Sequence, residues 1–336
     1  MAEARRKTAH AQEARSSDPH IELGLNAAIV TVREGQPHIL VVRPGTAGSG
    51  AWDSLPFGPF APRAHRTLEI GLREWVKRQT GLELGYVEQL YTFGDRGRHD
   101  EPGGAHTLSV GYLALTSGAG EELLGSHWSP WYAYFPWEDW RQGKPDILSD
   151  EIEPRLKQWA ERPPLPEEPA RALRRQERLR ISFGIGGGWD EEKVLERYEL
   201  LYEAGLVAEA KRDGRPAASH WPALPELGRP MAFDHRRILA TALGRLRGKL
   251  KYRPVVFELL PPEFTLYALQ KTVEAISGTL LHKQNFRRLV EQGGLVETTG
   301  NVSTATGGRP ARLYRFRREV VLERPAPGLR VKAGRG

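Results

Sequence analysis

The chain has 336 residues, no cysteine and a formal net charge of +7. Its length allows two domains, and the lack of cysteine excludes disulfides, thiolate metal sites and cysteine nucleophiles. No apolar run approaches the roughly eighteen residues that cross a bilayer, so we expect no membrane partner and a cytoplasmic location. Residues 1–20 are basic without an apolar stretch, which predicts a flexible tail rather than a secretory signal.

The charge is unevenly divided along the chain. Residues 229–336 contain 21 Lys and Arg against 8 Asp and Glu, a net of +13, whereas the remaining residues contain 28 against 34, a net of −6. This division is typical of a polyanion-binding module attached to another domain. A solvated basic surface without any partner would give the same count.

The front half shows a pattern of strands around one helix. Two apolar segments, 23–32 and 38–42, predict neighbouring strands, and the segment 52–60 (WDSLPFGPF) predicts a loop. A helix over 67–80 is expected next, capped by Thr67 and ended by Gly81, followed by strands near 86–93 and 106–115. This order indicates a compact α/β or α+β domain over residues 21–160.

The middle of the chain is rich in aromatics, prolines and glycines. The segment 128–140 (WSPWYAYFPWEDW) predicts a small additional core rather than a base-stacking platform. Residues 163–169 (PPLPEEP) indicate a stiff joint, and 161–228 a connecting segment with a helix over 190–204. The glycine-rich stretch 183–188 lacks the Lys-Ser/Thr of a phosphate-binding loop, which favours a tight turn.

Residues 229–320 show the pattern of a winged helix-turn-helix. A helix over 234–252, capped by Asp234, has one leucine-rich face and one face with the basic residues Arg236, Arg237, Arg245, Arg247, Lys249 and Lys251. A short helix starts at Thr265 and turns at Gly278, and a second helix covers 282–292. Strands over 295–298 and 312–316 enclose a loop, 299–311, that is typical of a wing; residues 321–336 predict a second flexible tail.

The second short helix carries side chains of the types that recognise DNA bases. Arginine, glutamine and asparagine pair with base edges in the major groove, lysine reaches phosphates, and a wing arginine can enter the minor groove. A winged helix that binds another protein is the alternative, but the charge favours double-stranded DNA. The DNA-contact candidates are Thr265, Lys283, Gln284, Asn285, Arg287, Arg288, Arg309 and Arg312.

These segments resemble a known family. DHRRILATALGRLRGKLKYRPVVFELLPPEFTL, HKQNFRRLVEQGGLVET and GGRPARLYRF, within 231–316, resemble the C-terminal part of the Nudix-related transcriptional regulators of NAD metabolism, the NrtR and NadQ groups. RTLEIGLREWVKRQTGLELGYVEQLYTFGDRGR resembles part of a Nudix domain. The resemblance implies an α+β protein with a Nudix-like α/β/α sandwich, a helical connection and a C-terminal winged helix.

The resemblance also implies a function. Such proteins repress NAD biosynthesis or salvage genes, usually as homodimers on palindromic operators. Their Nudix domain senses an adenine nucleotide, which implies ATP, NAD or ADP-ribose as an effector and no required cofactor.

The Nudix signature itself is degenerate in this chain. A Nudix hydrolase holds Mg²⁺ with several glutamates on one helix, including a Glu-Glu pair. One register places Arg78 and Gln79 at that pair, and the other places Lys77 and Arg78 there. A cation stands at the metal position in both, so we expect no metal site, no catalytic residues and no enzyme. An active Nudix hydrolase of nucleoside diphosphate derivatives with an accessory nucleic-acid-binding domain is the alternative.

Arginines near the degenerate signature suit a diphosphate, and Phe93 or Phe57 could stack on an adenine. Each of these residues could equally be part of an ordinary surface. The ligand-binding candidates are Arg43, Arg63, Arg66, Arg78, Phe93, Asp95, Arg96 and Arg98.

Overall fold

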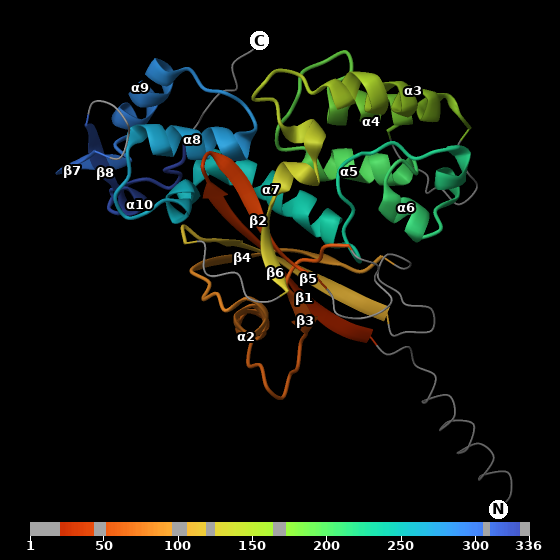
Figure 1. Cartoon of the computed structure of the whole chain (residues 1–336), viewed down its shortest axis with the longest axis horizontal. Coiled ribbons are helices and arrows are strands. Elements are labelled where there is room, and N and C mark those ends of the chain that lie inside the picture. Colours follow the sequence, from red (N-terminus) through yellow and green to blue (C-terminus); the bar gives the residue numbers. More distant parts are fainter. Residues whose placement is uncertain are drawn as a thin grey trace, which may run out of the picture.

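The computed structural model describes residues 21–43, 52–95, 106–118, 125–163, 173–304 and 310–329 (Figure 1). Within these ranges a mixed six-stranded sheet has the order β4-β5-β1-β2-β6, with β3 pairing with β1. β1 and β5 are parallel and the other neighbours are antiparallel. The strands are β1 (Ile21–Arg33), β2 (Gln36–Val42), β3 (Phe57–Pro59), β4 (Tyr86–Phe93), β5 (His106–Leu115) and β6 (Ser126–Pro130).

Both faces of the sheet are covered by helices, which explains why β1 is almost continuously apolar. Leu25, Ala27 and Ile29 point to the face covered by α2 (Leu68–Thr80). Ala28 and Val30 point to the opposite face, which is covered by α7 (His235–Tyr252). The second covering helix therefore comes from the terminal third of the chain.

The predicted ends of α2 are confirmed. Thr67 Oγ1 accepts a hydrogen bond from the Ile70 N–H at 3.2 Å, and Gly81 closes the helix with φ +70°. The loop prediction for 52–60 is wrong in part, because β3 lies within it and pairs with β1 over Gly24–Asn26. That short strand depends on a partner distant in sequence, which its Pro-Gly composition does not reveal.

α7 lies between the sheet and the helices above it (Figure 1). It packs against β1, β4 and β5 on one side, and against α5 (Val194–Glu203) and the winged helix on the other. The connecting region also contains α3 (Glu153–Glu161), α4 (Arg175–Phe183) and α6 (Ala208–Arg212). The helix predicted over 190–204 thus begins four residues later than expected. Gly184, within the segment 183–188 expected to form a tight turn, ends α4 with φ +65°.

The aromatic segment after β6 is confirmed as core. Trp131, Tyr134, Phe135 and Trp137 are fully buried. They lie in or between two short 3₁₀ turns, Trp131–Ala133 and Pro136–Glu138. They belong to one continuous cluster that includes the α7 face of the sheet, the connecting helices and the winged helix. The segment is therefore part of the main hydrophobic core and not a separate small core.

The winged helix consists of α8 (Leu266–Ser277), α9 (Lys283–Gly293), β7 (Val296–Ser303) and β8 (Ala311–Phe316), followed by α10 (Val320–Glu323). Backbone hydrogen bonds of 2.8 and 2.9 Å tie Phe264 to Tyr314 and attach the hairpin to the start of α8. The predicted wing loop is too long, because β7 continues to Ser303 across a register shift. No helix in the described ranges is long and apolar enough to span a membrane.

Candidate nucleic-acid interface and ligand site

Two buried side chains pack the recognition-helix candidate α9 against the winged helix, and two arginines bind its C-terminal end. Phe286 and Val290 are buried against the rest of the winged helix. Arg317 Nε donates to the Gly294 carbonyl at 3.0 Å, and Arg324 Nη1 donates to the Gly293 carbonyl at 2.8 Å. Cations at a helix C-terminus satisfy its last carbonyls and complement its dipole. These two arginines therefore stabilise the C-terminal end of α9 and are not available to bind DNA as part of its exposed face.

The outer face of α9 is exposed and polar. Its candidate side chains make no hydrogen bond or ion pair with any residue in the described part of the chain. Arginine and amide groups on such a face are those that recognise base edges. The exposed set is Lys283, Gln284, Asn285, Arg287 and Arg288.

The other DNA-contact candidates have different surroundings. Thr265 is half-buried and caps α8, with its Oγ1 accepting from the Ala268 N–H at 3.0 Å. Arg312 is exposed on β8, opposite Val302 of β7. Arg309 lies outside the described residues.

The outer basic face predicted for α7 is wrong at two positions, because Arg236 and Arg247 are each only 1% exposed. Arg236 donates to the Tyr134 carbonyl and pairs with Glu209 at 3.3 Å. Neighbours surround α7 on nearly all sides, so it has no continuous outer face. The +13 charge of the terminal third therefore overstates its exposed basic surface.

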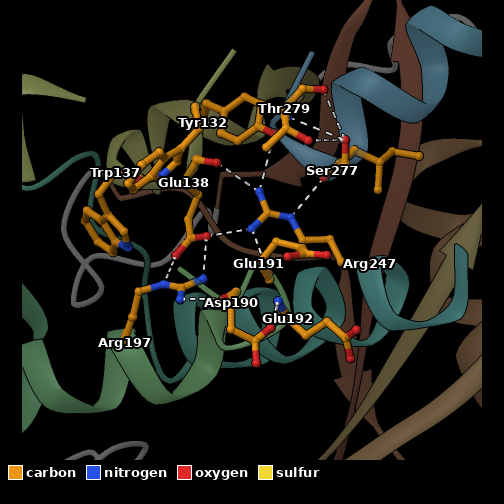
Figure 2. A network of polar contacts seen from close by, with 12 residues as sticks. Tyr132, Trp137, Glu138, Asp190, Glu191, Glu192, Arg197, Arg247, Ser277 and Thr279 are labelled. Carbon is orange, nitrogen blue, oxygen red and sulfur yellow. Dashed lines mark hydrogen bonds and ion pairs between the residues drawn. The ribbon is translucent and has the colours of Figure 1, made fainter. Parts of the chain in front are cut away.

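A buried ion network surrounds Glu138 (Figure 2). Glu138 Oε1 lies 2.6 Å from Arg197 Nε on α5, and Oε2 lies 2.6 Å from Arg247 Nη1 on α7. Burial raises the pKa of the Glu138 carboxyl, but the two guanidinium groups outweigh burial and hold that pKa below its ordinary value. The carboxylate is therefore the stable form inside this core.

The same network holds the turn of the helix-turn-helix (Figure 2). Arg247 Nε donates to the Ile276 carbonyl at 2.9 Å, and the Trp140 N–H donates to the Gly278 carbonyl at 2.7 Å. Gly278 has φ +73°, and a Cβ there would lie 2.5 Å from the Glu138 carbonyl oxygen. The turn between α8 and α9 is thus seated on the segment that follows β6.

The helix of the degenerate signature uses its side chains for structure. Gln79 Oε1 accepts from the Phe57 N–H at 3.0 Å, while Gln79 Nε2 donates to the Phe57 carbonyl at 2.8 Å. Arg78 pairs with Glu74 at 2.5 Å, and its guanidinium carbon lies 4.6 Å from the centre of the Trp75 ring. No group of three or more His, Asp or Glu residues able to hold a metal is found in the described ranges.

The predicted ligand residues are divided between the two faces of the sheet. Phe93 and Asp95 lie at α7: Asp95 forms an ion pair with Arg237, whose guanidinium lies 5.2 Å from the Phe93 ring centre. Phe93 is 1% exposed, so in this arrangement it offers no face to an adenine, contrary to the prediction.

The remaining candidates are exposed or outside the described residues. Arg63, Arg66 and Arg78 belong to α2 or the segment before it, on the other side of the sheet, and Arg43 follows β2. All four are exposed; Arg96 and Arg98 lie outside the described residues.

A cavity that the sequence did not indicate lies at the start of α7. It has a volume of about 180 Å³, and its walls come from β1, β3, β5 and the segment that leads into α7. Phe57, a predicted stacking residue, is part of the wall, together with Phe233 and His235. These residues are far apart in sequence, so no local pattern could have grouped them.

Comparison with known proteins supports two parts of this arrangement. Residues 256–316 match the NrtR DNA-binding winged helix domain. The ADPR responsive transcriptional repressor NtrR of Acinetobacter baylyi is 43% identical over 99 residues, which is 29% of this chain and 39% of that protein. The matched part thus spans well under two thirds of that relative.

The fold as a whole is also found in solved structures. The NrtR of Shewanella oneidensis, solved with a 27mer DNA, has a TM-score of 0.52 and 20% identity over 89% of this chain and 95% of its own. A MutT/nudix family protein from Enterococcus faecalis has a TM-score of 0.50 and 14% identity over 92% and 93%. This chain resembles the NrtR regulators. The predicted α+β fold, Nudix-like in front and winged helix at the end, is confirmed.

Proposed function

We propose that this chain is a cytoplasmic transcriptional repressor that binds DNA through α9 and the wing, under the control of a nucleotide in the Nudix-like part. The observation that carries this proposal is the exposed polar face of α9, whose arginines and amides have no partner in the described part of the chain. The NrtR match over residues 256–316 supports the same module as a DNA reader.

One relative suggests which effector to test first. The relative from Acinetobacter baylyi is described as responsive to ADPR, so ADP-ribose is the first effector to test, with NAD and ATP next. We further propose that NAD biosynthesis genes are the targets and that a homodimer binds a palindromic operator. Two recognition helices would then read half-sites roughly 34–36 Å apart.

Replacement of the signature residues supports sensing rather than hydrolysis. Gln79 is engaged with the Phe57 backbone and Arg78 with Glu74, so neither position supplies a carboxylate to Mg²⁺. The test is incubation of the full chain with ADP-ribose, NAD or ATP and Mg²⁺. We expect no turnover, and turnover at ordinary enzyme rates would contradict the proposal.

DNA binding is tested by gel shift on the DNA upstream of NAD biosynthesis genes and of the chain's own gene. Arg287→Ala and Arg288→Ala should each weaken binding about tenfold or more, because a lost bidentate contact to guanine costs roughly 1–3 kcal/mol. Arg180→Ala, which removes an exposed arginine from α4, is the matched control and should leave binding unchanged. Unchanged binding in both α9 variants would count against α9 as the recognition helix.

A further inference from the structure

The cavity at the start of α7 continues the face of the sheet that α7 covers. Gly24 and Asn26 of β1 precede Ala28 and Val30 on that face, and Ser109 lies opposite Gly24 on β5. A Cβ on Gly24 would lie 3.5–3.9 Å from the Thr107, Ser109 and Asn26 side chains. Glycine at this position thus keeps open a space that any other residue would partly fill.

Asn26 gives this cavity an unused hydrogen-bond donor. Its side chain is only 2% exposed, and Nδ2 has no partner among the residues that the structure describes. Leaving a buried donor unpaired costs about 1–3 kcal/mol, and native proteins rarely do so without a reason. Because Asn26 lines the cavity, a bound molecule with an acceptor atom would satisfy it.

Aromatic rings form another part of the cavity wall, and one of them, Phe57, is the cross-strand partner of Asn26. The ring centres of Phe57, Phe233 and His235 lie 5.2–5.3 Å from one another, which leaves no room for a further ring between them. His235 Nδ1 accepts from the Leu55 N–H at 3.0 Å, which fixes the orientation of its ring. A planar ligand must therefore stack on the cavity side of this cluster.

The backbone of the wall is strained. Phe233 has φ +52°, a conformation that a bulky residue rarely adopts. Such strain costs roughly 1–3 kcal/mol and gathers at ligand sites. Phe233 and His235 stand on either side of Asp234, the N-cap of α7, and His235 is the first residue of that helix. A ligand here therefore touches the helix that leads to the winged helix.

We propose that this cavity binds the heterocyclic base of the effector nucleotide: the ring stacks on Phe57 or Phe233 and accepts a hydrogen bond from Asn26 Nδ2. The proposal rests on the proposed function for the existence of a nucleotide effector. A volume of about 180 Å³ is below the roughly 300–1,000 Å³ that encloses a whole drug-sized ligand, so it suits one ring of a larger molecule.

The test measures ligand affinity of the full chain by calorimetry with ADP-ribose, adenosine, nicotinamide riboside and ribose 5-phosphate. ADP-ribose and adenosine should bind, because adenine is the only base of ADP-ribose, whereas nicotinamide riboside and ribose 5-phosphate should not. Asn26→Leu should weaken that binding about tenfold or more, because one hydrogen bond is lost. Its melting temperature without ligand should stay the same or rise, because an unpaired buried amide has been removed.

Two further variants keep the test decisive. Ser54→Ala removes another buried polar atom without a partner, outside the cavity lining, and should leave affinity unchanged. If Asn26→Leu fails to fold, the smaller Asn26→Ala also removes the donor, and it should also lose binding. Wild-type affinity in the folded Asn26 variant, or binding of ribose 5-phosphate without either nucleoside, would overturn the proposal.

DNA binding separates this inference from the proposed function. Asn26→Leu without nucleotide should shift operator DNA like the wild type, because Asn26 lies on the sheet and not on the winged helix. If the wild type binds a nucleoside through Asn26 but never shifts DNA, the base site stands and the repressor proposal fails.

Discussion

Arg247 and Glu138 form a buried ion pair, with Nη1 2.6 Å from Oε2, between the helix that covers the sheet and the aromatic segment after β6. Arg197 binds the second carboxylate oxygen from α5, so one carboxylate serves two guanidinium groups. Buried pairs of this kind add little net stability over apolar residues, but removing one partner is costly. Here they fix the relative orientation of α5, α7 and the aromatic segment, and of the turn between α8 and α9.

Glu138→Gln is expected to destabilise the fold by about 3–5 kcal/mol, because two buried guanidinium groups lose their counter-charge. The free energy of unfolding is measured by urea denaturation monitored by tryptophan fluorescence. Glu69→Gln, which breaks the exposed ion pair of Glu69 with Arg73, is the control and should cost no more than about 1 kcal/mol. Equal costs in the two variants would contradict the structural role given to Glu138.

Acid should destabilise the wild type through the same carboxyl. The folded-state pKa of Glu138 is lowered, so the unfolded state takes up its proton at a higher pH than the folded state. The stabilisation is therefore present above the unfolded pKa of about 4.3 and is lost as pH falls towards the folded value. Urea midpoints from pH 6 to 3 should fall more steeply for the wild type than for Glu138→Gln, and parallel curves would contradict this assignment.

Gly278→Ala should impair DNA binding as well as stability. The residue has φ +73°, and its new Cβ would meet the Glu138 carbonyl oxygen at 2.5 Å, so the turn between α8 and α9 must move. Gly214→Ala is a matched control, with φ +66° but no atom within 4 Å of the new Cβ. Both variants carry the backbone strain, of about 1–2 kcal/mol. The expectation is that only Gly278→Ala lowers operator affinity in a gel shift, and equal affinities would show that the clash is relieved locally.

The features that could be predicted from the sequence are those fixed by neighbours in the chain. Thr67 and Gly81 set the ends of α2 by local hydrogen bonding and backbone conformation, and both predictions hold. The burial of Arg247 could not be predicted, because its carboxylate partner lies 109 residues away. The same reason applies to the cavity at Asn26, whose walls come from three strands and the segment before α7.

The last prediction concerns the degenerate signature. Gln79→Glu would restore one of the glutamates of a Nudix pair, but a carboxylate cannot donate to the Phe57 carbonyl as the amide Nε2 does at 2.8 Å. The expected loss is about 1–3 kcal/mol in urea denaturation, because a partly buried acceptor loses its donor. Gln89→Glu is the control, since Gln89 is exposed on β4 and accepts from the Tyr112 hydroxyl, as a carboxylate also would.

The same variant should not restore hydrolysis of ADP-ribose with Mg²⁺, because Arg78 remains beside the new carboxylate and is paired with Glu74. The Arg78 guanidinium next to position 79 competes with Mg²⁺ for the carboxylates of α2. Formation of AMP and ribose 5-phosphate from ADP-ribose is the measurement, with Gln79→Glu and the double variant Arg78→Glu/Gln79→Glu side by side. Turnover in Gln79→Glu alone would show that Arg78 does not block the metal position. Turnover in the double variant only would identify Arg78 as the residue that keeps the metal out.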